Sequence, residues 1–244
     1  MIRIHATLHK CLTMYYLRVM EGTLNRPWRK TRFEHVESIQ GLFYNYLKAR
    51  RVISCSGFAV DTTRLGKDFR IVRFVRDPRD LIVSGYFYHR RGAEPWFRFR
   101  GPTDAYWSAI NGRVPADMPS DVSYAEYLES LSVEDGLLAE MEFRGAHLDS
   151  LRDWPDDERI RLYRYESILG NERETFEDIA DFYELTRGEK ARMGRLARRH
   201  RSARRTDDPH IRDPRPGQWQ SHFTPRVTRH FDREFADLLP LLGY

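Results

Sequence analysis

Short hydrophobic runs alternate along this chain with segments in which apolar residues recur every three or four positions. The runs at 2–7, 52–55, 69–75 and 160–165 are rich in β-branched and aromatic residues, which predicts strands. Helical periodicity is found at 12–22, 36–47, 123–151, 176–183 and 231–238. Strands that alternate with helices favour a parallel sheet with crossover helices. We therefore predict an α/β fold with a mainly parallel central sheet flanked by helices.

The passage from the strand at 69–75 into the next helix has the clearest boundary signals. Asp77 is a favourable N-cap, Pro78 fits the first helical position, and Asp80 suits the first turn. A helix that begins there carries Ser84 about two turns in.

Length and composition predict one sizeable domain over residues 1–244. The chain has 244 residues, of which 41% are hydrophobic and 13% aromatic, so it can bury a core and is not a disordered chain. It has no long uncharged apolar run, no apolar stretch after Met1, and only the cysteines Cys11 and Cys55. These features predict a cytoplasmic protein without a membrane span or a disulfide framework.

The net charge of +5 is compatible with an anionic ligand, nucleic acid or an acidic membrane surface. One stretch is crowded with arginines: Arg187, Arg192, Arg195, Arg198, Arg199, Arg201, Arg204 and Arg205. We interpret this stretch first as a solvated helix face. The alternative is a nucleic-acid-binding surface, which predicts steeply salt-dependent binding.

Ligands of parallel α/β sheets bind at the carboxyl ends of the strands, so the loops after Thr7, Val75 and Tyr165 are the candidate site. Lys10 and Thr13 follow the first strand at a helix start, where backbone N–H groups bind phosphate. No G-x-x-x-x-G-K-[ST] motif is present, which disfavours an ordinary P-loop ATPase or GTPase.

Arg76 and Ser84 provide a second set of phosphate-binding groups near another helix start, a guanidinium and a hydroxyl. Two such sites on adjacent strand ends suit a nucleotide that is phosphorylated at both ends.

Four segments together resemble the sulfotransferases that use 3′-phosphoadenosine 5′-phosphosulfate (PAPS), of the cytosolic and carbohydrate types. Phe69–His89 is similar to the 3′-phosphate motif of that family, and His9–Tyr15 is similar to its 5′-phosphosulfate loop. Leu162–Leu169 resembles the family's strand-end segment beside the adenine, and Arg212–Thr224 resembles its C-terminal nucleotide loop. The resemblance implies a P-loop-kinase-like architecture, PAPS as donor, adenosine 3′,5′-bisphosphate (PAP) as product and no metal.

The resemblance also implies residue roles. Lys10 corresponds to the catalytic lysine, Thr13 to a phosphate contact and Tyr15 to an aromatic residue that stacks on adenine. Arg76 and Ser84 would hold the 3′-phosphate, and Tyr165 would lie by the adenine. The remaining implied nucleotide-binding residues are Cys11, Leu12, Met14, Arg212, Arg215 and Gly217.

Three departures from the family pattern are visible. Leu12 replaces the loop glycine, and Met14 replaces one of a pair of threonines. The two residues after Arg212 are Asp213 and Pro214 rather than Lys-Gly, which leaves Arg215 as a substitute phosphate contact.

The third departure concerns the catalytic base. The histidine of cytosolic sulfotransferases has no counterpart, because the corresponding region reads Ser54-Cys-Ser-Gly-Phe. Carbohydrate sulfotransferases place a base about two dozen residues after the lysine, and here Glu34 and His35 lie there, just before the helix predicted at 36–47. His89 is the next candidate.

The predicted reaction is in-line transfer of the sulfuryl group to a hydroxyl or amine of a small molecule or carbohydrate, with Lys10 beside the leaving oxygen. Residues 90–151 are the predicted acceptor-binding region, where an irregular segment rich in aromatic residues is a candidate pocket wall. The sequence names neither the acceptor nor an oligomeric state. A P-loop-like nucleotide kinase remains an alternative that magnesium dependence would distinguish.

Overall fold

The computed structural model describes residues 1–27, 31–36, 51–201 and 213–244. The helix predicted at 36–47 and the candidate Arg212 therefore lie outside the described residues, except for Val36. The chain forms two compact units, one from the ranges Met1–Arg76 and Pro155–Ile211 and the other from Asp77–Trp154 and Arg212–Tyr244. The prediction of a single domain stays a prediction.

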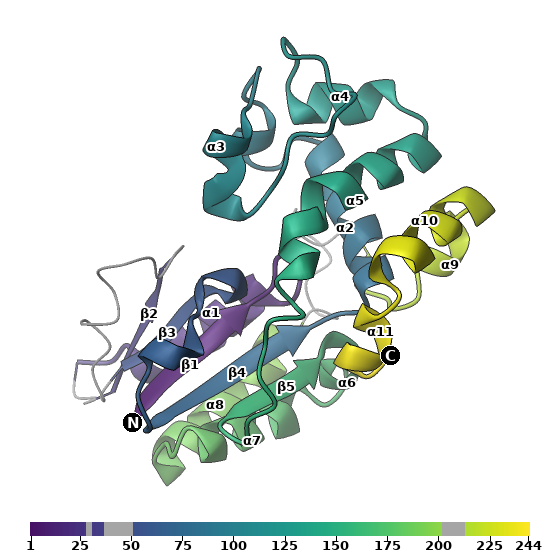
Figure 1. The fold of residues 1–244 in the computed structure, drawn as a ribbon. Coiled ribbons are helices and arrows are strands. Elements are labelled where there is room, and N and C mark those ends of the chain that lie inside the picture. Colours follow the sequence, from purple (N-terminus) through teal and green to yellow (C-terminus); the bar gives the residue numbers. More distant parts are fainter. Residues whose placement is uncertain (28–30, 37–50, 202–212) are drawn as a thin grey trace. The chain divides into compact units, whose positions relative to one another are not determined.

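The first unit contains a five-stranded parallel sheet with the strand order β2-β3-β1-β4-β5 (Figure 1). The strands are β1 (Ile2–Thr7), β2 (Arg32–His35), β3 (Arg51–Ser56), β4 (Phe69–Val75) and β5 (Ile160–Arg164). This sheet confirms the predicted α/β fold. The sequence did not predict β2, whose four residues include three charged or polar side chains.

Burial explains the pattern of the strands. β1, β3 and β4 are buried along most of their length, as expected of parallel strands covered on both faces. β2 and β5 are the edges of the sheet and carry exposed arginines, which discourages pairing with further chains.

Helices α1 (Thr13–Leu24), α7 (Glu172–Phe182) and α8 (Arg187–His200) pack together, and α6 (Tyr165–Ile168) follows β5 directly. Tyr16 of α1 joins the helices to the sheet. Its ring stacks on His5 at 3.5 Å and contacts Phe74 of β4 and Phe176 of α7. One face of the sheet is thus closed by an aromatic layer. The connection between β3 and β4 contains the short helices η2 (Gly57–Ala59) and η3 (Thr62–Arg64).

The second unit is helical. Its elements are α2 (Pro78–Arg90), η4 (Pro95–Phe97), α3 (Asp104–Trp107), η5 (Ser108–Ile110), α4 (Tyr124–Ser130), α5 (Val133–Asp149), α9 (Trp219–His222), α10 (Pro225–Phe235) and α11 (Leu238–Leu242). α5 packs against α2 and α10. No helix within the described ranges is both long enough and apolar enough to cross a membrane.

Two predicted helices are divided. The segment 123–151 breaks at Leu131, because the Ser132 side chain accepts a hydrogen bond from the Asp135 N–H and begins a new helix. The C-terminal helix predicted through Leu238 ends at Phe235, and α11 follows. The start of α2 is as predicted, with Asp77 as N-cap and Pro78 in the first turn.

Candidate active site

The loops after β1, β4 and β5 lie together at the carboxyl ends of the strands, because neighbouring parallel strands end on the same side of a sheet. The loop Leu8–Leu12 leads from β1 into α1, Arg76 follows β4, and Tyr165 follows β5. Three of the predicted nucleotide-binding segments are therefore neighbours.

The loop between β1 and α1 is suited to an anion. Lys10 and Leu12 adopt left-handed backbone conformations, with φ of 63° and 58°. No side chain caps α1, and its first turn has no acidic residue. Helix N-termini without a side-chain cap bind phosphate groups through their N–H groups.

Leu12 keeps the backbone conformation that a glycine would adopt at this position. For a residue with a Cβ atom the left-handed region costs about 1–2 kcal/mol. The departure from the family's glycine therefore preserves the course of the loop at an energetic cost. Backbone strain of this kind is concentrated at functional sites.

The other loop residues differ in accessibility. Cys11 is fully buried, and this burial raises the pKa of its thiol, so a reactive thiolate is not expected. Lys10 and Thr13 are half-buried, and the Thr13 hydroxyl lies 3.4 Å from the Leu8 carbonyl oxygen. Met14 is 48% exposed.

Arg76 and Tyr165 are in direct contact. The guanidinium carbon of Arg76 lies 4.4 Å from the centroid of the Tyr165 ring, and both residues are buried. Arg76 is also close enough to Cys11 to oppose the rise in its pKa. The carboxyl ends of the strands thus bring together the guanidinium of Arg76, the ring of Tyr165 and the uncapped N-terminus of α1.

Tyr15 packs against α7 and α8 and is not open to a ligand. It is buried, its hydroxyl donates a hydrogen bond of 2.8 Å to the Ala197 carbonyl of α8, and its ring meets Phe176 edge-on at 5.3 Å. These contacts give Tyr15 a role in packing α1 against α7 and α8. Its contact with adenine stays a prediction.

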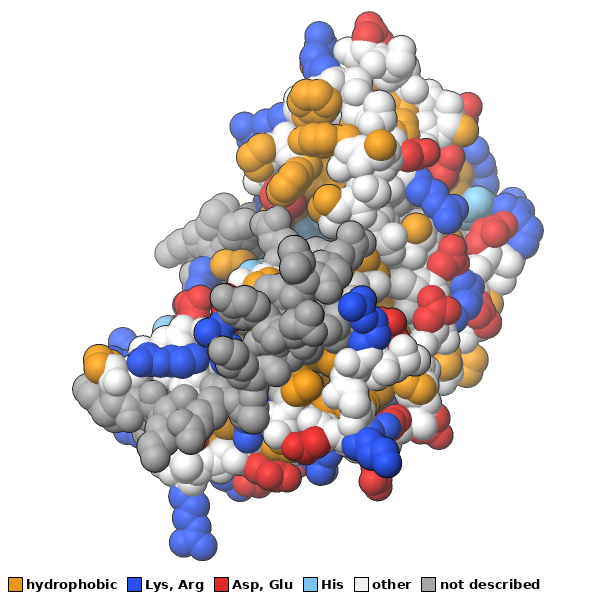
Figure 2. All heavy atoms as spheres, turned by 60° about the vertical axis from the view of Figure 1, so that its left-hand side comes forward, with side chains coloured by type: hydrophobic (Ala, Val, Ile, Leu, Met, Phe, Trp, Pro, Cys, Tyr) orange, Lys and Arg blue, Asp and Glu red, His pale blue; other side chains and the backbone are white. Residues whose placement is uncertain are grey.

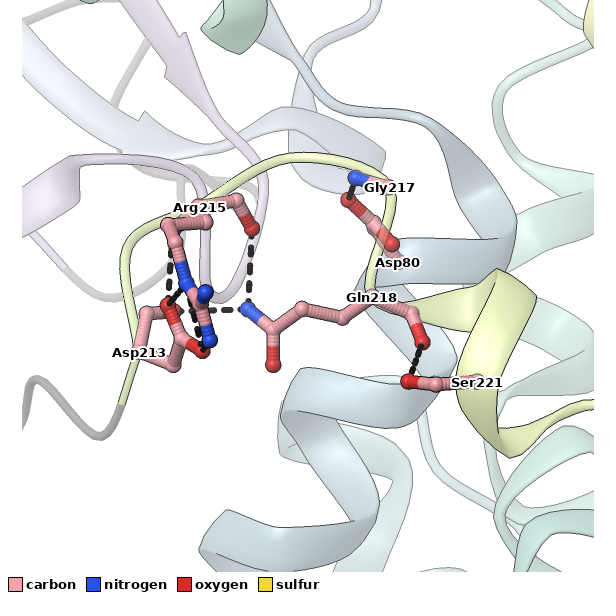
Figure 3. Close-up of polar contacts among 6 residues, drawn as sticks. All are labelled: Asp80, Asp213, Arg215, Gly217, Gln218 and Ser221. Carbon is pink, nitrogen blue, oxygen red and sulfur yellow. Dashed lines mark hydrogen bonds and ion pairs between the residues drawn. The ribbon is translucent and has the colours of Figure 1, made fainter.

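The C-terminal candidates belong to the second unit, where Asp80 holds the loop around Gly217 (Figure 3). The Asp80 carboxylate accepts hydrogen bonds from the Gly217 N–H at 2.7 Å and from the Trp219 N–H at 2.9 Å. The Arg79 guanidinium stacks on the Trp219 ring at 3.8 Å. Asp80, expected only to favour the start of α2, therefore fixes a loop more than 130 residues away in sequence.

The phosphate contacts proposed for the second unit, Ser84 and Arg215, are less buried than Arg76. Ser84 is half-buried on α2. Arg215 is highly exposed, and its guanidinium is paired with Asp213 at 2.7 Å. Because Asp213 already neutralises this charge, Arg215 is a weaker candidate for a phosphate contact than Arg76. The roles of Ser84, Arg215 and Gly217 stay predictions.

Glu34 and His35 lie on β2 rather than in the approach to a helix. The Glu34 carboxylate forms an ion pair with Arg51. His35 is exposed, and its Nδ1 lies 3.1 Å from the Ser54 carbonyl oxygen. Since a carbonyl oxygen can only accept, Nδ1 donates this hydrogen bond, and the tautomer that does so has its lone pair on Nε2.

The strand register reveals a neighbour of His35 that the sequence did not single out. His35, Ser54 and His5 occupy one row across β2, β3 and β1. His5 is fully buried, with Nδ1 3.0 Å from the Ser54 hydroxyl. Burial and the nearby His35 lower the pKa of His5 well below its usual range, so His5 is neutral at pH 7. The sequence signal that could have identified His5 is a polar residue at an inward-facing position of an otherwise apolar strand.

The sequence matches the family model described as "Sulfotransferase domain" over residues 42–243. The chain belongs to the sulfotransferase domain family. The match includes Arg76, Ser84, Tyr165 and Gly217 but begins after the Lys10 loop and after Glu34 and His35. The resemblance identified from sequence motifs is thus confirmed for the family, and the assignment of Lys10 rests on its motif and its geometry.

Solved structures confirm the sulfotransferase fold. Mouse sulfotransferase SULT7A1 in complex with PAP has a TM-score of 0.56 and 20% identity, over 97% of this chain and 84% of that chain. A retinol dehydratase in complex with retinol and PAP has a TM-score of 0.51 and 16% identity, over 97% of this chain and 80% of that chain. No curated protein matches the sequence.

His89, the remaining base candidate of this sulfotransferase domain, is enclosed in a buried network. Its Nδ1 lies 2.7 Å from Glu140 Oε2, and its Nε2 lies 3.1 Å from Arg144 Nη2. Glu140 also pairs with Arg144 at 2.9 Å and accepts from the Tyr124 hydroxyl at 3.0 Å. Both ring nitrogens of His89 are engaged, so the geometry assigns it a structural role.

The aromatic residues in and just before the predicted acceptor-binding region differ in exposure. Tyr86, Tyr88, Phe97 and Trp107 are core residues. Phe99 and Tyr106 are 50% and 39% exposed, with their rings 4.9 Å apart. Figure 2 shows exposed hydrophobic side chains gathered at the upper end of the face that it presents. Acceptor binding by residues 90–151 stays a prediction.

Proposed function

We propose that the protein transfers the sulfuryl group of PAPS to a hydroxyl or amine of a small molecule or carbohydrate. The contact between Arg76 and Tyr165 beside the open N-terminus of α1 is the observation that carries the proposal. It places a buried cation and an aromatic ring on the strand ends next to the loop that contains Lys10. Family membership and the PAP-bound sulfotransferases of the same fold support it.

The residues at this edge fit a nucleotide with two phosphate-type groups. The N–H groups at the start of α1 would hold the 5′-phosphosulfate, since anions bind at uncapped helix N-termini. Arg76 would hold the 3′-phosphate, because a guanidinium makes bidentate contacts with phosphate oxygens. Tyr165, which already fixes the Arg76 side chain, would face the adenine.

PAPS supplies the sulfuryl group, and PAP is the leaving group. Lys10 provides a full positive charge for the bridge oxygen on which charge develops as the S–O bond breaks. A preorganised cation of this kind contributes several kcal/mol in a site from which water is excluded, about 2.7–4 kcal/mol for a single donor. Lys10 belongs to the loop that leads directly into the N-terminus of α1.

His35 is the better candidate for the general base. The Nδ1–H bond to Ser54 leaves Nε2 to accept the acceptor's proton as the new O–S bond forms. Glu34 is held by Arg51 and is therefore the weaker candidate. His35 lies at the carboxyl end of β2, and the Lys10 loop follows the carboxyl end of β1, so both are on the same side of the parallel sheet.

A transfer assay tests the proposal. Purified protein is incubated with ³⁵S-labelled PAPS and a panel of phenols, sterols, amines and saccharides, and labelled product is separated from donor. We expect product with at least one acceptor class and a loss of at least ~100-fold for Lys10→Ala. Lys67→Ala is the matched control, since Lys67 is an exposed lysine before β4. Equal rates for the two variants would remove Lys10 from the mechanism.

A further inference from the structure

The loop 213–219 of the second unit depends on polar contacts for its conformation. Every residue of the loop is half-buried or exposed, so none of its side chains is enclosed in the core. Within the loop, the Gln218 side-chain amide donates to the carbonyl oxygens of Asp213 at 2.8 Å and Arg215 at 2.9 Å (Figure 3). Segments with few buried apolar contacts open locally at a low cost in free energy. Contacts from outside the loop therefore decide how firmly it is held.

Asp80 of α2 holds this loop with both oxygens of its carboxylate. Oδ2 accepts a hydrogen bond from the Gly217 N–H at 2.7 Å, and Oδ1 accepts one from the Trp219 N–H at 2.9 Å. Asp80 is only 1% exposed, and a buried carboxylate is costly unless its oxygens are hydrogen-bonded. Asp80 and the loop therefore stabilise each other.

Arg79 adds a second contact to the same loop. Its guanidinium carbon lies 3.8 Å from the centroid of the Trp219 ring. Asp77 orients this guanidinium, because its two carboxylate oxygens accept from Nε at 2.9 Å and from Nη2 at 2.7 Å. The first turn of α2 thus holds both the backbone and the ring of Trp219.

The turn that anchors the loop directly follows Arg76 in the chain. Asp77 is the next residue, and Asp80 is four residues after Arg76. Arg76 is the proposed ligand of the 3′-phosphate, and the anchored loop carries the candidates Arg215 and Gly217. The segment that supplies the proposed phosphate ligand is therefore continuous with the turn that fixes the loop. A loop that is ordered before a ligand arrives loses less conformational entropy on binding.

We infer that Asp80 is a positioning residue of the nucleotide site, which holds the loop 213–219 in the conformation that binds PAPS and PAP. The inference rests on the proposed sulfotransferase function. Asp80 acts through the N–H groups of Gly217 and Trp219, since a carboxylate would repel a phosphate group. If a smaller fraction of the protein has the loop in its binding conformation, the apparent affinity for the nucleotide falls by the same factor.

Asp80→Asn is the decisive variant. Asparagine has nearly the same shape but one acceptor oxygen, so one of the two N–H groups would face an amide NH₂ group. Without nucleotide, the Gly217 and Trp219 amide hydrogens should exchange with solvent at least ~10-fold faster than in the wild-type protein. PAP should bind at least ~10-fold more weakly in isothermal titration. In the transfer assay KM for PAPS should rise while kcat is unchanged, because binding is lost equally in the ground state and the transition state.

Two control variants belong to the same unit. Asp149→Asn makes the same substitution at an exposed carboxylate, which is paired with Arg152. Ser132→Ala removes the side-chain cap of α5 and should lower stability without changing the loop. Both controls should bind PAP within ~3-fold of the wild-type affinity, because neither touches the loop.

Three outcomes overturn the inference. Unchanged exchange of the Gly217 and Trp219 amides in Asp80→Asn would show that Asp80 does not hold the loop. Faster exchange with unchanged PAP affinity would show that the nucleotide does not use the loop conformation. An equal loss of PAP affinity in Ser132→Ala would assign the effect to general destabilisation. If the wild-type protein itself does not bind PAP, the proposed sulfotransferase function fails, and the exchange rates still decide whether Asp80 holds the loop.

Discussion

The guanidinium of Arg76 lies over the ring of Tyr165, 4.4 Å from its centroid, so that the loops after β4 and β5 are joined by a cation–π contact. Both residues were assigned to the nucleotide by resemblance, and each is buried in the folded chain. The contact holds a positive charge in one orientation before any ligand arrives. Preorganisation of this kind lowers the cost of ordering side chains on binding.

The first prediction concerns this contact. Tyr165→Phe retains the ring, and we expect its affinity for PAP to stay within ~3-fold of the wild-type value. Tyr165→Leu removes the ring and should weaken PAP binding by ~3- to 30-fold, the equivalent of about 0.5–2 kcal/mol. Isothermal titration with PAP measures both variants. Equal affinities for the two would show that the ring does not position Arg76.

The second prediction concerns the strained loop. Leu12→Gly places a glycine where φ is 58°, and we expect unfolding to require about 0.5–1 kcal/mol more free energy, after the entropic cost of glycine. Leu162→Gly is the control, because Leu162 lies in the regular strand β5 and its replacement should be destabilising. Urea denaturation measures both. A loss of stability in Leu12→Gly equal to that of Leu162→Gly would contradict the strain.

The third prediction concerns the buried network around His89. A Cβ atom at Gly85 of α2 would lie 2.2 Å from Glu140 Oε1, whereas at Gly145 of α5 the nearest heavy atom is 4.0 Å away. Gly85→Ala should therefore displace the Glu140 carboxylate and cost about 3–5 kcal/mol, as expected when a buried ion pair is broken. Gly145→Ala should be stabilising by up to about 1 kcal/mol.

Thermal denaturation compares the two glycine variants. The account requires their melting temperatures to move in opposite directions. If Gly85→Ala is as stable as Gly145→Ala, then the network does not depend on the close approach of α2 to α5.

The fourth prediction distinguishes the two base candidates. His35→Gln should lower turnover by at least ~100-fold with unchanged PAP affinity, because it removes the proton acceptor but not the nucleotide site. Glu34→Gln should stay within ~3-fold of the wild-type rate, because its half-exposed ion pair with Arg51 contributes little. The transfer assay with labelled PAPS gives the rates. A larger loss for Glu34→Gln would reverse the assignment.

Local signals were sufficient for much of the fold and for identifying the loops that follow β1, β4 and β5. β4 could be predicted from its alternating apolar run. The start of α2 could be predicted because Asp77 and Pro78 favour a helix start through their own backbone positions. The buried face of α1 could be predicted from the helical spacing of Tyr15, Tyr16 and Val19. β2 could not be predicted, because only four residues pair at the edge of the sheet and their side chains are mostly polar.

Features that depend on pairing between distant segments were beyond the sequence. The row formed by His5, Ser54 and His35 exists only in the register of three strands. Asp80 suited the first turn of α2 by its charge, but its contacts with Gly217 and Trp219 require the fold of the second unit.

The central claim is that this sulfotransferase domain binds a nucleotide with a phosphate at the 3′ position, and a thermal shift with PAP tests it most directly. PAP is compared with AMP and ATP at equal concentrations, with the wild-type protein and with Arg76→Ala. At a hundredfold excess over its dissociation constant, PAP should stabilise the wild-type protein by about 2.7 kcal/mol. AMP and ATP should give smaller shifts, and Arg76→Ala should lose the preference for PAP. Equal shifts with PAP and AMP in the wild-type protein would contradict the account.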